Sequence, residues 1–370
     1  MENVYDVHVH YSFDIPIGET VEIFKEEFEK TETQKFCFLS LPHHARGGKV
    51  DFDEMQNIKG LYLKYTFGES AYAFAHLEHP TSHDDIERVA EDFLRQAKTY
   101  LSVGYDGIKM LEGYPSLIKA WNLAIDSPVY DKFYSFMEEN GYPIIMHIAN
   151  PEENWDITRV SEYAIKVGRF YDESYPKKDD ITASALNVMK KHPNLKLILA
   201  HMGFMSYNIE TALEYMSYPN TMLDVTPGDE QLTNMQSRWD IWLPFFEKYQ
   251  DRILYGTDFY AFPKGANWEV SFTRRPNFVH QFFETDTEHT YIDKTFRGVK
   301  IDKTIRNKIY RDNFSALLQE RKPIDMDYVD KELFRLSLIP DKKSRHGSDD
   351  LIYICGSLMK YRHESEKNHD

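Results

Sequence analysis

The sequence predicts a parallel (β/α)8 barrel, a TIM barrel, on three observations. Short apolar runs typical of buried strands recur along the chain, and helical patterns fall between them. The runs are spaced by about 35 residues on average, which matches one βα unit. A chain of 370 residues accommodates one barrel of about 250 residues with insertions. The predicted strands lie near residues 4–9, 36–41, 72–77, 105–110, 143–148, 195–200, 220–225 and 252–257.

Helices between these strands are indicated by apolar periodicity and by end signals. The apolar residues of 86–101 keep a 3.6-residue period, and Gly104 follows as a stop. Ser127-Pro128 has the pattern of a helix start, with Gly141 beyond the end of that helix. A third helix is predicted over 182–191, before a proline.

Two segments exceed a minimal barrel, and a tail follows it. Residues 150–181 come after the fifth strand and 259–300 after the eighth, so both are expected as long loops over the strand ends, the first partly helical. We predict a barrel domain over 1–321 and a C-terminal extension, 322–370, that contains one apolar run, Leu351–Cys355, and packs on the barrel.

Composition excludes several classes of protein. The chain has no apolar run of about 18 residues, so no transmembrane helix is expected. A net charge of −16 without a dense basic run disfavours nucleic acid as a partner. Two cysteines, Cys37 and Cys355, make no disulfide framework, and we expect a cytoplasmic protein. A homo-oligomer is compatible with the sequence.

The first strand carries the sharpest chemical signal, Asp6-Val7-His8-Val9-His10. Side chains alternate between the faces of a strand, so His8 and His10 point the same way and can bind one metal ion. The alternative is a pair of hydrogen-bonded histidines inside the barrel. Chance alone produces some His-x-His pairs among 15 histidines, so the motif needs support from elsewhere.

That support comes from the ends of three later strands, which are followed by His147, His201 and Asp258. Catalytic groups of (β/α)8 barrels lie at the C-terminal ends of the strands. We therefore predict that these residues meet His8 and His10. A turn carboxylate remains the alternative for Asp258, and a buried, hydrogen-bonded histidine for His201.

These motifs together resemble the amidohydrolase-related metal-dependent hydrolases, most of all the branch that contains aminocarboxymuconate-semialdehyde decarboxylase. The likeness extends over roughly residues 1–320. It rests on DVHVH at 6–10, IIMHIAN at 144–150, PNLKLILAHMG at 193–203, ILYGTDF at 253–259 and IYRDNF at 309–314.

The resemblance implies one divalent metal ion held by His8, His10, His147 and Asp258. Zinc is the first choice for three histidines and a carboxylate, with manganese or another ion as alternatives. It also implies that His201 is the catalytic acid or base, although the residues alone leave open whether His201 binds the metal. Asp258 is a second candidate for accepting a proton.

Other polar residues near the strand ends are candidates for substrate binding. Lys109 lies near the end of the fourth strand, where it could face the substrate, bridge two metals after carboxylation, or be an ordinary barrel or surface lysine. Glu112 is a weaker candidate of the same kind. His43, His44 and Arg46 follow the second strand and form either a polar loop or a wall that binds an anion.

The remaining polar candidates are assigned to supporting roles. Asp224 and Thr226 follow the seventh strand and are expected to support the site through hydrogen bonds. Nine other histidines lack metal-ligand spacing and are expected at the surface: His76, His79, His83, His192, His280, His289, His346, His363 and His369.

The leading functional hypothesis is a metal-dependent hydrolase that uses a metal-activated water to cleave an amide, ester or lactone of a small molecule. Cations near the barrel mouth favour a carboxylate-bearing substrate. The alternatives are a non-oxidative decarboxylase of an aromatic or unsaturated acid, which the resembled branch also contains, and a non-catalytic barrel with an idle metal site.

Overall fold

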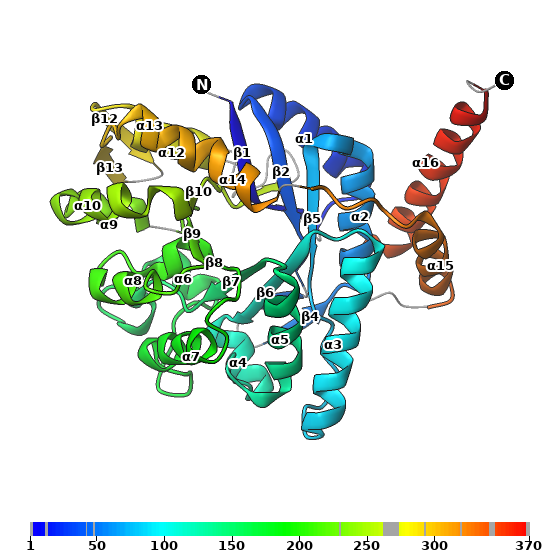
Figure 1. The fold of residues 1–370 in the computed structure, drawn as a ribbon, viewed down its shortest axis with the longest axis horizontal. Coiled ribbons are helices and arrows are strands. Elements are labelled where there is room, and N and C mark those ends of the chain that lie inside the picture. Colours follow the sequence, from blue (N-terminus) through cyan, green and yellow to red (C-terminus); the bar gives the residue numbers. More distant parts are fainter. Residues whose placement is uncertain are drawn as a thin grey trace.

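The computed structural model describes most of the chain (Figure 1). Side chains of 43–46, 49–52, 163 and 362–367 fall outside this description. The described residues are 3–11, 14–41, 43–46, 49–228, 231–261, 274–291, 294–318, 320–339 and 345–367.

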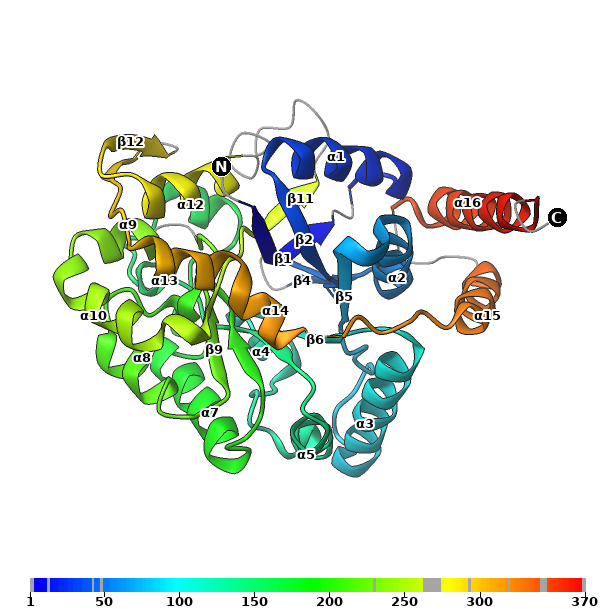
Figure 2. The same ribbon diagram turned by 45° about the horizontal axis from the view of Figure 1, so that its top comes forward.

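A parallel sheet that curls into a barrel forms the centre of the molecule, which confirms the predicted TIM-barrel fold (Figures 1 and 2). Nine strands of the described chain pair in the order β10-β9-β8-β7-β6-β5-β2-β1-β11. They are β1 (Val4–Tyr11), β2 (Thr33–Leu39), β5 (Ala71–Ala75), β6 (Gly107–Gly113), β7 (Ile144–Ile148), β8 (Leu197–Leu199), β9 (Thr221–Asp224), β10 (Ile253–Leu254) and β11 (Phe259–Ala261).

The eighth barrel strand differs from its prediction, because it is broken in two. The apolar run at 252–257 predicts one continuous strand. In the described part of the chain, β10 instead pairs with β9, and β11 pairs with β1. Between them the chain still bonds to β1, since Val7 N donates to Tyr255 O and Asp258 N donates to His8 O, at 3.0 and 2.8 Å. The break turns Asp258 toward β1 while the barrel closes.

Helices cover the outside of the sheet because each presents one apolar face to it. In α3, for example, Val89, Phe93 and Ala97 are fully buried, and Gly104 ends the helix with a φ of +118°. The helices around the barrel are α1 (Ile17–Lys30), α2 (Gln56–Phe67), α3 (Ile86–Val103), α4 (Pro115–Trp121), α5 (Asp131–Asn140), α7 (Lys178–Lys191), α8 (Ile209–Tyr215), α9 (Gln231–Gln236), α10 (Trp239–Tyr249), α13 (Lys303–Asn307) and α14 (Asn313–Leu317).

Three insertions lie beyond the C-terminal ends of strands. A hairpin of β3 (His43–Arg46) and β4 (Lys49–Phe52) follows β2 and was not predicted. The loop after β7 is partly helical, as expected, with α6 at Glu162–Lys166 and a 3-10 turn at Glu152–Trp155. After β11 come α12 (Arg275–Glu284) and the hairpin of β12 (Glu288–Tyr291) and β13 (Lys294–Arg297).

The C-terminal residues form α15 (Met326–Ser337) and α16 (Gly347–Lys367), and α16 projects from the barrel in both views (Figures 1 and 2). The buried carboxylate of Asp350 anchors it, accepting from Lys59 Nζ and from Ile17 N, both at 2.7 Å. The domain boundary at residue 321 stays a prediction. No described helix combines the length and the apolar character needed to cross a membrane.

Candidate metal centre

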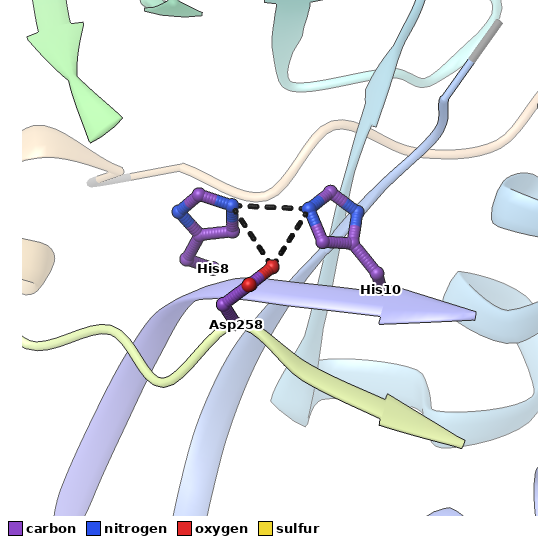
Figure 3. A group of neighbouring side chains, drawn as sticks. All are labelled: His8, His10 and Asp258. Carbon is purple, nitrogen blue, oxygen red and sulfur yellow. Dashed lines mark hydrogen bonds and ion pairs between the residues drawn. The ribbon is translucent and has the colours of Figure 1, made fainter. Parts of the chain in front are cut away.

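Three side chains converge at the C-terminal end of β1 (Figure 3). Nε2 of His8 lies 3.0 Å from Nε2 of His10, and Oδ1 of Asp258 lies 3.7 and 3.4 Å from these two atoms. Both imidazoles are almost fully buried. His8 and His10 thus point to the same place, as predicted. The carboxylate of Asp258, about 250 residues later in the sequence, lies beside them.

The opposite ring nitrogens fix the protonation of both histidines. Nδ1 of His10 lies 2.9 Å from the carbonyl oxygen of Leu39, which can only accept, so this nitrogen carries the proton. Nδ1 of His8 lies 2.9 Å from Oδ2 of Asp224, the pairing typical of a metal-binding imidazole. Both Nε2 atoms therefore present lone pairs.

The donor set fits a divalent metal ion. Two imidazole nitrogens and a carboxylate oxygen are ligands that zinc prefers, and ligands about 2.0–2.1 Å from a tetrahedral ion lie about 3.3 Å apart. The observed separations of 3.0 to 3.7 Å bracket this value. Three acceptors at such distances, two of them on buried imidazoles, repel one another unless a cation lies between them.

The carboxylate of Asp258 is held by the backbone and by an arginine. Asp258 has a φ of +53°, a conformation that costs a non-glycine residue about 1–3 kcal/mol and persists where surrounding structure enforces it. Nη1 of Arg275, in α12, donates to Oδ2 and also to the backbone oxygen of Asp258. Burial raises the pKa of Asp258, and the charge of Arg275 opposes that shift.

A glycine lets the broken strand approach β1 this closely. A Cβ on Gly256 would lie 2.4 Å from Oγ1 of Thr226 and 3.0 Å from Cβ of His8. Thr226 also bonds to the His8 ring, with Oγ1 3.2 Å from Nδ1. Glycine at 256 is therefore a packing requirement of the site.

His201 lies beside this group, on a strained turn. The turn Ala200–Phe204 contains four consecutive residues with positive φ, the first of them His201 with a φ of +56°. Its backbone N donates to Oδ1 of Asp224 at 2.7 Å, and its ring lies 5.1 Å from the ring of His8. Nδ1 of His201 is buried and has no hydrogen-bond partner in the described structure. Burial lowers the pKa of His201 well below its usual value, so the ring is neutral near pH 7.

His147 is near the centre but outside the convergent group. Its ring lies 5.3 Å from that of His201, and its Nε2 lies 3.2 Å from Oδ1 of Asn150. Burial lowers the pKa of His147 to about 3, so this imidazole is also neutral. Its role as a fourth ligand stays a prediction, and filling that role requires Nε2 to exchange Asn150 for the ion.

Lys109 reaches the centre from β6. The side chain is buried, and Nζ lies 3.4 Å from Nε2 of His8. Burial lowers the pKa of Lys109 to about 8, against the raising effect of Asp224 and Asp258. The ammonium of Lys109 therefore lies beside the convergent acceptor atoms, where a positive charge is favoured. Lys109 is buried inside the barrel and is not exposed at its mouth.

Comparison with known proteins identifies the family. The profile of the amidohydrolase family matches residues 74–318, about two thirds of the chain. The chain belongs to the amidohydrolase family. The predicted family resemblance is thereby confirmed. None of the curated proteins compared matches this amidohydrolase.

Solved structures share the fold at low sequence identity. An uncharacterized TIM-barrel protein from Bordetella bronchiseptica is 12% identical with a TM-score of 0.55, over 86% of this chain and 99% of its own. A dihydroxybenzoic acid decarboxylase from Polaromonas sp. JS666, with bound manganese and the inhibitor 2-nitroresorcinol, is 16% identical with a TM-score of 0.51, over 86% and 97%. 4-Oxalomesaconate hydratase from Rhodopseudomonas palustris is 14% identical with a TM-score of 0.52, over 90% and 99%.

The sequence interpretation of the amidohydrolase missed two cations. Arg275 binds Asp258 directly, and the charge of Arg169 opposes the rise in the pKa of Asp258. Arg169 and Arg275 belong to the two long loops after the fifth and eighth strands, so loop length was the available signal. The side chains of His43, His44 and Arg46 lie outside the described residues, although their backbone forms β3.

The expectation that the other histidines lie at the surface was wrong for four of them. His76, His192 and His280 are buried, and so is the side chain of His79. Nε2 of His79 lies 3.0 Å from Oε1 of Glu112, and its Nδ1 lies 2.9 Å from Nε2 of His83. Their burial comes from packing that no local spacing encodes.

Proposed function

We propose that this amidohydrolase is a metal-dependent hydrolase that cleaves an amide, ester or lactone bond in a small carboxylate-bearing molecule. One observation carries the proposal: three acceptor atoms of His8, His10 and Asp258 converge, and the ring of neutral His201 lies 5.1 Å from the ring of His8. This pairs a cation site with a base a few ångströms away, which is the combination that hydrolysis requires.

The proposed ion is zinc, held by His8, His10 and Asp258 with His147 as the fourth ligand. Manganese is the alternative that the bound ion of the Polaromonas decarboxylase suggests. A divalent ion there would act as a Lewis acid, polarising a carbonyl oxygen and making water a better nucleophile at neutral pH.

The chain's own residues handle the proton. Neutral His201 accepts a proton from the attacking water and returns it to the leaving nitrogen or oxygen when the scissile bond breaks. Arg275 already binds one oxygen of Asp258, which makes Asp258 the weaker base of the two. We therefore assign the acid and base steps to His201 and a holding role to Asp258.

Cations around the centre support a carboxylate on the substrate. Lys109 lies next to His8, and the charges of Arg169 and Arg275 reach Asp258. Arg46, His43 and His44 are proposed to add to this environment from the hairpin after β2. We expect Lys109→Met to raise KM for a carboxylate substrate while the protein still binds one metal ion. Loss of metal in this variant would instead make Lys109 a ligand, for example as a carboxylated bridge.

Non-oxidative decarboxylation is the second candidate, since structures that share this fold include dihydroxybenzoate decarboxylases. The deciding experiment incubates metal-loaded protein with panels of lactones, amides, esters and aromatic acids. Hydrolysis without release of carbon dioxide supports the proposal, with His201→Ala as the inactive control. Carbon dioxide release from an aromatic acid, with no hydrolysis, would overturn it.

A further inference from the structure

The C-terminal helix carries an apolar surface that the barrel leaves uncovered. Among the large hydrophobic side chains of the described residues, the four most exposed lie in the C-terminal extension. Ile352 and Met359 of α16 are 71% and 70% exposed, and Phe334 and Leu338, in and just after α15, are each 66% exposed. Exposed apolar residues concentrated in one appendage mark an interaction site more often than scattered ones do.

The two faces of α16 have different surroundings. One face is anchored: Ile354 and Leu358 are buried, and Asp350 is bound by Lys59. Ile352, Gly356 and Met359 recur at spacings of four and three, so they form one stripe on the opposite face. This stripe, Ile352-Gly356-Met359, lies opposite the buried Ile354 and Leu358, on a helix that projects from the barrel (Figure 2).

Gly356 stands in the middle of a 21-residue helix, and no contact among the described residues explains it. A Cβ at this position would meet no described atom within 4 Å, so the described part of the chain does not require glycine here. Glycine costs a helix interior about 1 kcal/mol relative to alanine. A glycine between two exposed apolar residues lets the backbone of another helix approach closely.

Charges of opposite sign at the two ends of the stripe make it complementary to the same stripe on a second copy of the chain. Exposed Asp349 lies at one end and exposed Lys360 at the other. In an antiparallel pair of α16 helices that cross at Gly356, Ile352 of each copy meets Met359 of the other, and Asp349 comes near Lys360. In a parallel pair the like charges would lie together.

We propose that α16 is a dimerisation helix that packs antiparallel against α16 of a second copy of this chain, about a two-fold axis at Gly356. Such an interface is isologous, since the same patch serves both copies. Phe334 and Leu338 supply additional apolar surface on the same appendage. The proposal concerns assembly and is independent of the proposed reaction.

Light scattering tests the assembly. The wild-type chain of 43.7 kDa should give about twice that mass at micromolar concentration. Ile352→Glu combined with Met359→Glu should halve the mass without changing the circular dichroism. The matched control, Leu213→Glu on the exposed part of α8, should remain dimeric. A monomeric wild type, including one that binds vesicles or another protein through α16, overturns the proposal, and so does a dimer that survives the double substitution.

Disulfide trapping tests the orientation, in protein whose Cys355 is replaced by serine. Gly356→Cys should form a disulfide-linked dimer under mild oxidation, because the two copies of this position meet at the axis. Lys360→Cys should not, because the two copies of residue 360 lie about eight residues, or roughly 12 Å, apart along the helix. Equal trapping of both variants would indicate a parallel pair and overturn the proposed geometry. The remaining cysteine, Cys37, is buried and serves as an internal control.

Discussion

Two clusters at the C-terminal ends of the barrel strands contain the same residue types, two histidines and a carboxylate, and yet differ in chemistry. In the first, His8, His10 and Asp258 direct three acceptor atoms at one point. In the second, His79 uses its two ring nitrogens for different partners, Glu112 at 3.0 Å and His83 at 2.9 Å.

Direction explains the difference. The two nitrogens of an imidazole point away from each other, so a histidine bonded on both sides links its neighbours in series and cannot give both atoms to one ion. In the first cluster, Leu39 and Asp224 take the outer nitrogens and leave the inner ones free to converge. Residue type and contact distance alone therefore do not define a metal site. The hydrogen-bond partners of the outer ring nitrogens determine whether the inner nitrogens can bind one ion.

The largest expected effect concerns metal content. We expect about one equivalent of divalent metal in the wild-type protein and almost none in His8→Ala, because the remaining donors no longer surround the ion. His83→Ala should keep the full equivalent. Elemental analysis of protein prepared without chelators makes the measurement. Two equivalents in the wild type, one of them lost in His83→Ala, would show that the second cluster also binds metal.

Next in size is the effect of His201→Ala on turnover. We expect kcat to fall by about 10²–10⁴-fold, the usual contribution of a general acid or base, while the metal content stays near one equivalent. Steady-state kinetics and elemental analysis on the same preparation separate the two properties. If this variant lost metal as completely as His8→Ala, His201 would be a ligand.

Arg275 should affect the strength of metal binding. We expect Arg275→Met to weaken metal affinity by about 10- to 100-fold, because Asp258 loses the partner that orients its carboxylate. The matched control is Arg274→Met, because Arg274 is the adjacent arginine and is exposed. Competition with a chromogenic chelator gives the dissociation constants. Equal affinities for both variants would contradict the orienting role.

The smallest effect concerns stability and comes from the second cluster. Burial raises the pKa of Glu112 to about 7 from an ordinary value of 4.5. The folded state therefore keeps a proton that the unfolded chain releases, so this residue lowers the free energy of unfolding as pH rises from 4.5 to 7, by up to about 1.4 kcal/mol per pH unit. Glu112→Gln should flatten that dependence, whereas Glu29→Gln, at an exposed position, should not. Urea titrations across this pH range measure it, and an unchanged slope in Glu112→Gln would contradict the shifted pKa.

The sequence by itself determined the features that depend on local periodicity. Apolar runs and helical spacing predicted the barrel strands and the long partly helical loop after the fifth one, since alternation along a strand and the 3.6-residue helical period are properties of the backbone. The same alternation predicted that His8 and His10 point together. The apolar runs also predicted that His147, His201 and Asp258 lie at strand ends, and the family resemblance implied their roles.

Only the tertiary structure decided which of these atoms meet. Asp258 reaches His8 because the eighth strand breaks and bonds to β1 across some 250 residues, and Arg275 joins it from a helix of the following loop. The burial of His79 and the exposure of Ile352 are likewise results of packing. Contacts between distant segments depend on how the sheet closes and how the helices pack on it. The spacing of residues along the sequence does not predict these arrangements.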